Sequence, residues 1–175
     1  MSQRCVTLLG PMGSGKSSVG EGLADALGYE FLDTDHLVEK RAERKISDIF
    51  ANEGEAYFRA LEAEVIAGLA GMESHVISSG GGAVLDPQNR HVFKSLGLTV
   101  YLKASARELY QRIKNDKSRP LLMNAEDPKA EVRKILEARE GLYLEADIIV
   151  DTEDLSVEEV VDTLIDELAK RTVGD

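Results

Sequence analysis

One stretch constrains this chain more than any other: residues 10–17 read Gly-Pro-Met-Gly-Ser-Gly-Lys-Ser. The stretch matches the pattern G-x-x-x-x-G-K-[S/T], follows an apolar run that ends at Leu9, and precedes a helix-like segment that starts near Lys16. In this context the glycines let backbone N–H groups surround phosphate oxygens, Lys16 reaches the β- and γ-phosphates, and Ser17 offers a hydroxyl to Mg²⁺. A plain strand-to-helix turn would not explain Lys and Ser at this spacing. We therefore predict a nucleotide-binding phosphate loop.

Apolar runs alternate with helical patterns along the whole chain, which predicts an α/β fold with a mostly parallel sheet. The 175 residues fit one domain, residues 1–175. Two C-terminal helices have clear start signals, Asp127-Pro128 and the capping box Ser156-x-x-Glu159. The other expected elements are strands at 4–9, 29–32, 75–78, 98–102 and 147–150 and helices at 16–27, 34–45, 53–71, 87–95 and 106–114.

The composition excludes several function classes. A net charge of −11 argues against a broad contact with nucleic acid or an anionic membrane surface, so local positive groups must meet any anionic ligand. No apolar run approaches the length of a membrane span. The three histidines are far apart and lack Cys/His ligand spacing, so no zinc site is predicted. We expect neither a nucleic-acid partner nor a membrane partner.

The only cysteine, Cys5, lies in the first predicted strand, where a buried and unreactive thiol is expected. A single cysteine cannot form an internal disulfide, which suits a reducing compartment. The first strand begins within a few residues of Met1, which leaves no room for a signal peptide. We therefore expect a cytoplasmic protein.

Two carboxylates, Asp33 and Asp35, follow the strand predicted over 29–32. The carboxyl ends of parallel strands form the ligand-binding edge of an α/β sheet, so both should lie beside the phosphate loop. The third predicted strand lacks the terminal Asp that many phosphate-loop enzymes use for Mg²⁺, so Asp33 is the candidate for that charge. Asp35 is the candidate base for an attacking hydroxyl. Alternatively, the two residues only cap the helix that begins at Thr34.

Two arginines lie in otherwise apolar helical patterns. Arg139 continues an inward-facing stripe, and a charge that points into the protein needs an anion. Arg59 lies in the helix predicted over 53–71, where a solvent-exposed ion pair with Glu62 is the simplest interpretation. Both guanidinium groups are suited to two-point binding of a carboxylate or phosphate.

Three consecutive glycines, Gly80, Gly81 and Gly82, directly follow the third predicted strand. A flexible turn needs one glycine, so three of them predict a close approach of the backbone to a ligand. Arg112, on the helix predicted over 106–114, either lies flat against a nucleotide base or pairs with Glu108 one turn earlier.

The polar segment 115–126 interrupts the alternating pattern and carries an apolar tip at 121–123. It is either an ordinary surface loop or a mobile lid that closes over a ligand. Arg119, next to Pro120, is the residue of this segment that would reach a phosphate.

Together these residues resemble the shikimate kinases, and the resemblance runs from Cys5 to about Asp154. Each motif alone is a weak or moderate signal, but all of them occur in the family's order. Beyond the phosphate loop they are Phe31-x-Asp33-x-Asp35, Ile49-Phe50-x-x-x-Gly54-Glu55-x-x-Phe58-Arg59-x-x-Glu62, Ser78-x-Gly80-Gly81-Gly82, Arg119-Pro120-Leu121-Leu122 and Arg139-x-x-x-Tyr143.

The resemblance implies a nucleoside-monophosphate-kinase-like fold with three α/β/α layers, a five-stranded parallel sheet, a substrate-binding segment at about 33–62 and a mobile lid at about 115–126. It implies transfer of the γ-phosphoryl of ATP to the 3-hydroxyl of shikimate with Mg²⁺, by a monomer whose partners are these small molecules. Arg59, Arg139 and the glycines 80–82 would then hold shikimate. The implied catalytic residues are Lys16, Asp35 and Arg119, the implied metal ligands Ser17 and Asp33, and the implied ATP-binding residues Gly13, Ser14, Gly15, Lys16, Ser17, Ser18, Arg112 and Arg119.

Two other functions share the phosphate loop. A gluconate-kinase-like sugar kinase would have the same fold, but it would not need both arginines together with the triple glycine. A nucleotide-dependent switch protein would also begin with this loop, but the chain has no Asn-Lys-x-Asp motif for guanine. Its only Asp-x-x-Gly, at residues 25–28, falls in the first predicted helix, away from a γ-phosphate.

Overall fold

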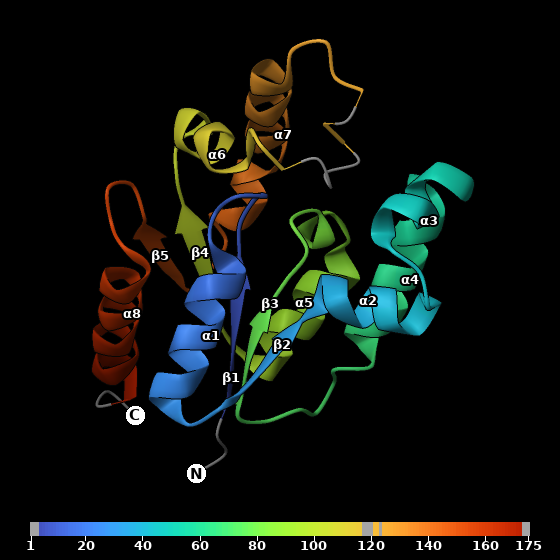
Figure 1. Cartoon of the computed structure of the whole chain (residues 1–175). Helices are drawn as coiled ribbons and strands as arrows, with labels where there is room; N and C mark the ends of the chain where they lie inside the picture. The colour runs from blue at the N-terminus through green and yellow to red at the C-terminus, as the bar shows by residue number, and fades with distance from the viewer. Residues whose placement is uncertain (1–3, 117–120, 123, 173–175) are drawn as a thin grey trace.

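The computed structural model describes residues 4–116, 121, 122 and 124–172. Within them, parallel strands form a five-stranded sheet in the order β2-β3-β1-β4-β5 (Figure 1). The central strand β1 pairs with β3 on one side and with β4 on the other. The phosphate loop, which follows β1, therefore begins in the middle of the sheet's carboxyl edge. The strands are β1 (Cys5–Leu9), β2 (Glu30–Asp33), β3 (His75–Ser78), β4 (Gly97–Lys103) and β5 (Ile148–Asp151).

Helices cover both faces of the sheet, which confirms the predicted three-layer α/β/α architecture. Helices α1 and α8 lie against one face, and α4, α5 and α7 contribute to the core on the other (Figure 1). The helices are α1 (Lys16–Leu27), α2 (Thr34–Ala42), α3 (Ile46–Asn52), α4 (Glu55–Ala67), α5 (Pro87–Leu96), α6 (Ala106–Ile113), α7 (Pro128–Tyr143) and α8 (Val157–Thr172), with a short 3₁₀ turn η1 at Ala83–Leu85.

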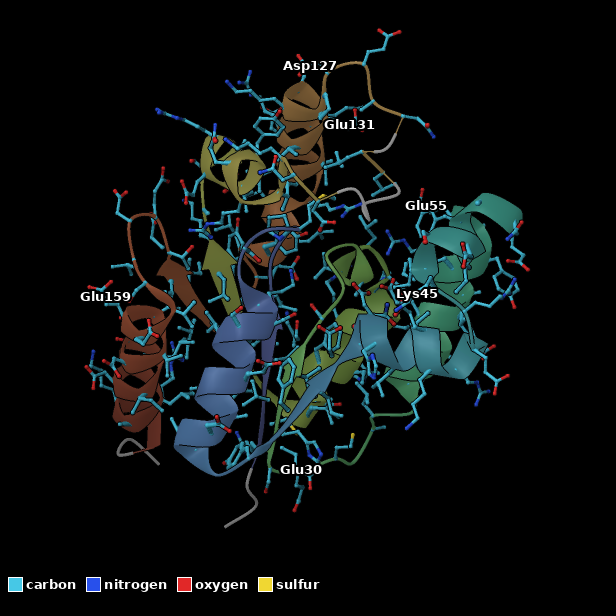
Figure 2. All side chains as sticks on the ribbon, in the orientation of Figure 1. Glu30, Lys45, Glu55, Asp127, Glu131 and Glu159 are labelled. Carbon is cyan, nitrogen blue, oxygen red and sulfur yellow. The ribbon has the colours of Figure 1, made fainter. Side chains whose placement is uncertain are left out.

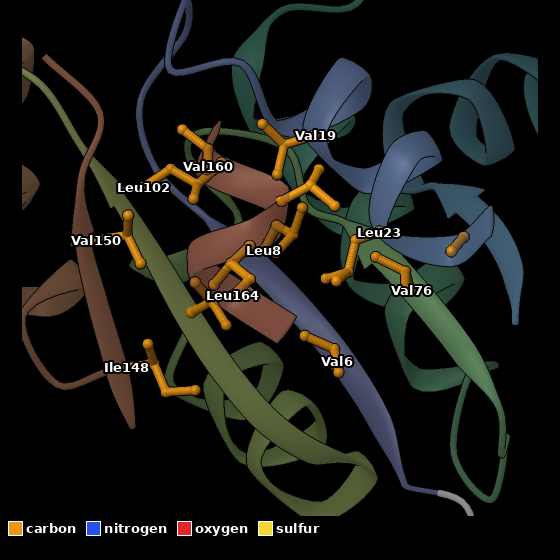
Figure 3. Packing of buried hydrophobic residues seen from close by; sticks show 13 residues of the cluster. Val6, Leu8, Val19, Leu23, Val76, Leu102, Ile148, Val150, Val160 and Leu164 are labelled. Atoms are coloured by element: carbon orange, nitrogen blue, oxygen red, sulfur yellow. The ribbon is translucent and has the colours of Figure 1, made fainter. Parts of the chain in front are cut away.

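The alternation of side chains along the strands explains the two cores. Successive residues of a strand point to opposite faces, so Val6 and Leu8 face α1 and α8, whereas Leu9 faces the other layer. On the first face they pack with residues of both helices, as Figure 3 shows, including Val19, Leu23, Val160 and Leu164. On the second face the core contains Ile66, Phe93, Tyr101 and Tyr143. Both helical layers are therefore anchored to the strand that leads into the phosphate loop.

The predicted start signals of the last two long helices are confirmed. Asp127, which is labelled in Figure 2, caps the N-terminus of α7 and accepts a hydrogen bond from the N–H of Ala130 at 3.1 Å. At the start of α8, Glu159 accepts from the N–H of Ser156 at 2.7 Å while the Ser156 hydroxyl accepts from the N–H of Glu159 at 3.2 Å. Val157, the first residue of α8, is 39% exposed and lies outside the cluster that packs on the sheet.

Two predicted helices have different bounds in the structure. The helix expected over 34–45 ends at Ala42, because Glu43 adopts a left-handed conformation with φ of 52° and its N–H bonds to the carbonyl of Glu39. A separate helix, α3, then follows, and the sequence interpretation did not anticipate it. The helix expected over 53–71 is α4, which begins after Gly54, whose φ of 86° favours glycine.

Candidate active site

The phosphate loop leaves its backbone donors available for an anion. Gly13 and Gly15 have φ of 81° and 89°, a region that favours glycine. No side chain caps the start of α1, so the positive end of this helix faces the loop without a protein anion. The Lys16 ammonium lies back over the loop and donates to the carbonyls of Gly10 at 2.7 Å and Pro11 at 3.0 Å. The loop thus has the conformation and charge of a phosphate site.

Asp33 performs the capping role and also faces the phosphate loop. One carboxylate oxygen accepts hydrogen bonds from the N–H groups of Asp35 at 2.9 Å and His36 at 3.3 Å, which caps α2. The other oxygen accepts a hydrogen bond from the Ser17 hydroxyl at 2.9 Å. A hydroxyl and a carboxylate side by side suit Mg²⁺, which is usually held by one or two protein oxygens together with phosphates. The two interpretations of Asp33 are therefore compatible.

Asp35 is not the residue that caps α2, and it lines the cleft. It lies in the first turn of the helix and lines the cleft together with Asp33. One of its carboxylate oxygens lies so close to Gly80 that a Cβ there would be 2.7 Å away. Asp35 therefore faces the glycine turn, as a base for a hydroxyl bound there would need to.

The Arg59–Glu62 ion pair is buried, which corrects the expectation of a solvent-exposed pair. The Arg59 guanidinium donates to Glu62 at 2.8 Å, and the Glu62 side chain is only 1% exposed. A second, longer contact of 3.3 Å joins Arg59 to the half-exposed Glu55. The sequence pattern missed the burial because the glycine turn, which is distant in the sequence, closes over this part of α4.

Glu62 is a site residue that the sequence interpretation treated only as a partner of Arg59. Its second carboxylate oxygen is buried and has no hydrogen-bond partner among the described residues. Burial raises the pKa of Glu62 above its ordinary value of 4.5, although the charge of Arg59 acts in the opposite direction. This oxygen is therefore a ready acceptor for a ligand hydroxyl or for water.

Arg139 points into the protein, as its position in the apolar stripe predicted. It is 7% exposed and lines the cleft together with residues of α4 and the glycine turn. Two of the three glycines leave room for side chains of the site, because a Cβ on Gly82 would collide with the Arg59 guanidinium and one on Gly80 with Asp35 and Glu62. A Cβ on Gly81 would have only ordinary contacts, at 3.4 Å or more, so this reason applies to Gly80 and Gly82.

Arg112 forms the ion pair with Glu108 that one of the two alternatives predicted. It pairs with Glu108 at 3.0 Å, and its guanidinium also donates to the carbonyls of Gly13 and Thr152, each at 3.3 Å. These contacts place the group on the cleft wall beside the phosphate loop. Contact with a nucleotide base stays a prediction.

These residues line one cleft with a volume of about 400 Å³. Ser14 and Gly80 lie behind its wall, where Ser14 is 1% exposed and the N–H of Gly80 donates to Thr34. Arg119 lies outside the described residues, as do the rest of residues 117–120 and residue 123 of the predicted lid. The other predicted residues all line the cleft, namely Gly13, Gly15, Lys16, Ser17, Ser18, Asp33, Asp35, Arg59, Gly81, Gly82, Arg112 and Arg139.

Part of the lining was not predicted as site residues. Phe50 and Phe58 lie 4.9 Å apart, ring centre to ring centre, and form an apolar wall with Ile46 and Leu121. Their signal in the sequence is the ordinary pattern of a core-facing helix, which does not distinguish a core from a cleft wall. Four cationic side chains of an otherwise acidic protein converge on the same cleft, namely Lys16, Arg59, Arg112 and Arg139.

Comparisons with known proteins agree with this arrangement. The family model described as shikimate kinase matches residues 12–169. The shikimate kinase of Geobacter sulfurreducens is 46% identical over 158 residues, covering 90% of this chain and 87% of that protein. The one from Histophilus somni is 42% identical and covers 94% of both. The structure of Acinetobacter baumannii shikimate kinase in complex with shikimate superposes with a TM-score of 0.92 at 36% identity, covering 96% of this chain and 94% of that chain.

Proposed function

The chain belongs to the shikimate kinase family, and we propose that it transfers the γ-phosphoryl group of ATP to the 3-hydroxyl of shikimate, giving shikimate 3-phosphate and ADP. The observation that carries the proposal is the pairing, in one cleft, of a phosphate loop with a carboxylate and two arginines on the facing elements. A phosphoryl donor and a hydroxylated, anionic acceptor would then meet between them.

At the donor end, the loop backbone and Lys16 bind the β- and γ-phosphates, and Arg112 lies against the base. Residues 13–18 supply the N–H groups and hydroxyls for this contact. Ser17 and Asp33, whose oxygens lie 2.9 Å apart, would hold Mg²⁺. Held there, the ion would supply positive charge to offset the negative charge of the transferred phosphoryl group.

At the acceptor end, Arg59 and Arg139 bind the carboxylate of shikimate. Asp35 orients the 3-hydroxyl and takes its proton as the oxygen bonds to phosphorus, while the bond from phosphorus to the bridging oxygen of ADP breaks. The glycine turn contributes backbone contacts to the ring hydroxyls. The buried ion pair with Glu62 holds Arg59 in place, so little side-chain entropy is lost when the acceptor binds.

We propose a monomer that acts in the cytoplasm. Cys5 is buried and donates to the carbonyl of Met72, and burial raises the pKa of its thiol, so it is unreactive. No helix in the described part of the chain has the length and apolar character needed to cross a membrane. Light scattering of the purified protein at micromolar concentration would test the monomer, because a dimer would double the measured mass.

The simplest test of the function is ADP release with and without shikimate. A kinase of this kind turns over slowly until the acceptor arrives, whereas a nucleotide switch hydrolyses ATP without it. Gluconate in place of shikimate tests the sugar-kinase alternative, which the 46% identity to a shikimate kinase disfavours. Release of ADP that is the same with and without shikimate would reject the proposal.

A sharper test asks whether Arg139 binds the carboxylate of the acceptor. Removing one member of a buried, hydrogen-bonded charge pair costs about 2 to 5 kcal/mol, so Arg139→Ala should lower kcat/KM for shikimate by about 30-fold to several thousandfold. Arg139→Lys should recover only part of the loss, because an ammonium lacks the planar fork. The KM for ATP should change far less.

The control is a shikimate analogue whose carboxylate is replaced by a neutral amide. The wild type should use it poorly, and Arg139→Ala should no longer distinguish it strongly from shikimate. Comparing kcat/KM for two acceptors and two enzymes isolates the contact. If the variant discriminates between the acceptors as sharply as the wild type, Arg139 has a structural role only.

A further inference from the structure

A buried tyrosine lies directly behind the glycine turn. Tyr143, the last residue of α7, has no exposed surface, and its hydroxyl donates a hydrogen bond of 2.5 Å to the carbonyl of Gly81. Its ring stacks on Tyr101 of β4, with ring centres 5.1 Å apart. The hydroxyl of Tyr101, by contrast, is buried without a hydrogen-bond partner among the described residues. The two neighbouring tyrosines thus differ in whether the hydroxyl has partners, and those of Tyr143, the Gly81 carbonyl and Arg139, belong to the cleft wall.

Protein donors occupy every carbonyl of the turn. Gly80 accepts from the N–H of Ala83 at 3.0 Å, Gly82 accepts from the N–H of Leu85 at 3.1 Å, and Gly81 accepts from Tyr143. The N–H of Gly80 donates to the buried Thr34 hydroxyl at 2.9 Å. In the described part of the chain, the N–H groups of Gly81 and Gly82 make no such bond. The turn therefore presents donors, and not acceptors, to the cleft.

The Tyr143 contact determines the direction of one of these donors. In a trans peptide the C=O and the N–H point in opposite directions. A hydroxyl that holds the Gly81 carbonyl from behind therefore turns the Gly82 N–H of the same peptide away from Tyr143. Gly81 and Gly82 both line the cleft. The bond consequently presets a donor for an oxygen atom of whatever occupies the acceptor end.

We propose that Tyr143 is a positioning residue for acceptor binding: its hydroxyl holds the peptide between Gly81 and Gly82 so that the Gly82 N–H meets an oxygen of the polyhydroxylated acceptor. This proposal rests on the function proposed above. Helix α7 carries Arg139 one turn before Tyr143, so the same helix face supplies a charged contact to the acceptor and supports the turn behind it. Neither role requires Tyr143 to touch the acceptor.

The hydroxyl of Tyr143 can donate its hydrogen bond at any pH at which an enzyme works. Burial raises its pKa to about 12, although the nearby Arg139 acts in the opposite direction. The group therefore keeps its proton throughout the working range of an enzyme. The orientation of the turn should be independent of pH between about 6 and 9 as far as Tyr143 is concerned.

The test compares Tyr143→Phe with Tyr101→Phe. Both changes remove one hydroxyl from a buried, stacked ring, but only the first removes hydrogen-bond partners, the Gly81 carbonyl and Arg139. The exchange of the Gly82 amide, described below, separates the contribution of the turn from that of Arg139. Loss of one such bond should raise the KM for shikimate about 3- to 10-fold in Tyr143→Phe. The KM for ATP should stay within about twofold and kcat within about threefold, while Tyr101→Phe should match the wild type in all three.

A second readout follows the turn itself. In ¹⁵N-labelled wild type, saturating shikimate should slow the hydrogen exchange of the Gly82 amide, and in Tyr143→Phe this protection should fall at least about threefold. A purely structural tyrosine would lower the melting temperature without changing either readout. Equal KM values for shikimate in Tyr143→Phe and wild type, or equal rises in KM for both substrates, would overturn the proposal.

The double variant Tyr101→Phe/Tyr143→Phe covers the case in which Tyr143→Phe does not fold. It also removes the unpartnered hydroxyl, whose burial costs stability, so part of the loss is offset. If the double variant also fails to fold, Tyr143 is a folding residue and the proposal is wrong. Failure of the wild type to phosphorylate shikimate would reject the proposed function itself, whereas an active wild type with an unaffected Tyr143→Phe would reject only the positioning role.

Discussion

The two ends of the cleft are built in different ways. The proposed donor end is made by consecutive residues between β1 and α1, and the groups proposed to bind phosphate there are mainly backbone N–H groups and one lysine. The acceptor end combines side chains of α2, α4 and α7 with the glycine turn after β3. The first is visible in one motif of eight residues, whereas the second exists only when segments more than 100 residues apart meet.

The difference has a physical basis. Phosphate can be bound by a local loop, because several N–H groups and a helix end suffice for a compact anion. A ring with a carboxylate and several hydroxyls needs contacts from several directions, and rigid elements must hold each of them. The acceptor end also contains the carboxylate of Glu62. Burial raises the pKa of this group and so disfavours its ionised form.

The largest expected effect is the loss of phosphoryl transfer in Lys16→Ala, which distinguishes the donor end of the cleft from the acceptor end. Lys16→Ala should reduce phosphoryl transfer to the background of the assay, at least about 10³-fold, because the charge on the β- and γ-phosphates loses its stabilisation. Acceptor binding should survive, since the Lys16 ammonium donates to carbonyls of the loop and the proposed acceptor contacts come from other residues. Coupled ADP release measures phosphoryl transfer, and the rise in melting temperature on adding shikimate measures acceptor binding. Turnover like the wild type would reject the phosphate-loop assignment.

Asp35→Asn tests the proposed base, which lies between the donor end and the acceptor end of the cleft. Loss of a positioned base should lower the single-turnover rate by about 10²- to 10⁴-fold. The fold should be little affected, because Asp33 and not Asp35 caps α2. Rapid-quench kinetics with enzyme in excess gives the rate, and thermal unfolding provides the control. A rate close to that of the wild type would show that Asp35 only orients the acceptor.

Glu62→Gln should change how stability depends on pH. The unfolded chain loses this proton near the ordinary pKa of 4.5, whereas the folded protein holds it to higher pH. The folded state then binds more protons, so the stability contributed by Glu62 falls as the pH rises from about 4.5 through the raised pKa. Gln resembles the protonated form, so the variant should gain stability relative to the wild type between pH 4 and pH 7.5.

Urea unfolding at the two pH values measures this difference. The matched control is Glu55→Gln, at the half-exposed partner of the same arginine, which should change the free energy of unfolding by less than about 1 kcal/mol at both. A difference between Glu62→Gln and wild type that is the same at pH 4 and pH 7.5 would contradict the effect of burial.

Cys5→Val should have the smallest effect, because Cys5 begins β1 at the end away from the phosphate loop. The side chain is buried and its single contact to Met72 is weak, so activity should stay within about twofold of the wild type. Steady-state kinetics with both substrates measures this. A folded variant without activity would show that β1 transmits changes along its length to the cleft.

Local patterns predicted much of this molecule. The motif at residues 10–17, the alternating strands, and the caps at Asp127 and Ser156 depend on neighbours in the chain, and the structure confirms the loop, the five-stranded parallel sheet and both caps. The boundary between α2 and α3 was missed because Glu43 adopts a left-handed conformation that neither glycine nor proline marks.

By itself, the sequence determined the layers of the fold, the phosphate loop and the set of charged residues that a site requires. Only the tertiary structure decided that Arg59 pairs with the buried Glu62, that Gly80 and Gly82 leave room for this pair and Asp35, and that Tyr143 contacts the turn from behind. The reason is that burial is set by whatever packs over a residue. Here the turn at residues 80–82 covers Arg59 and Glu62 of α4. The apolar pattern of α4 does not indicate which distant segment packs over it.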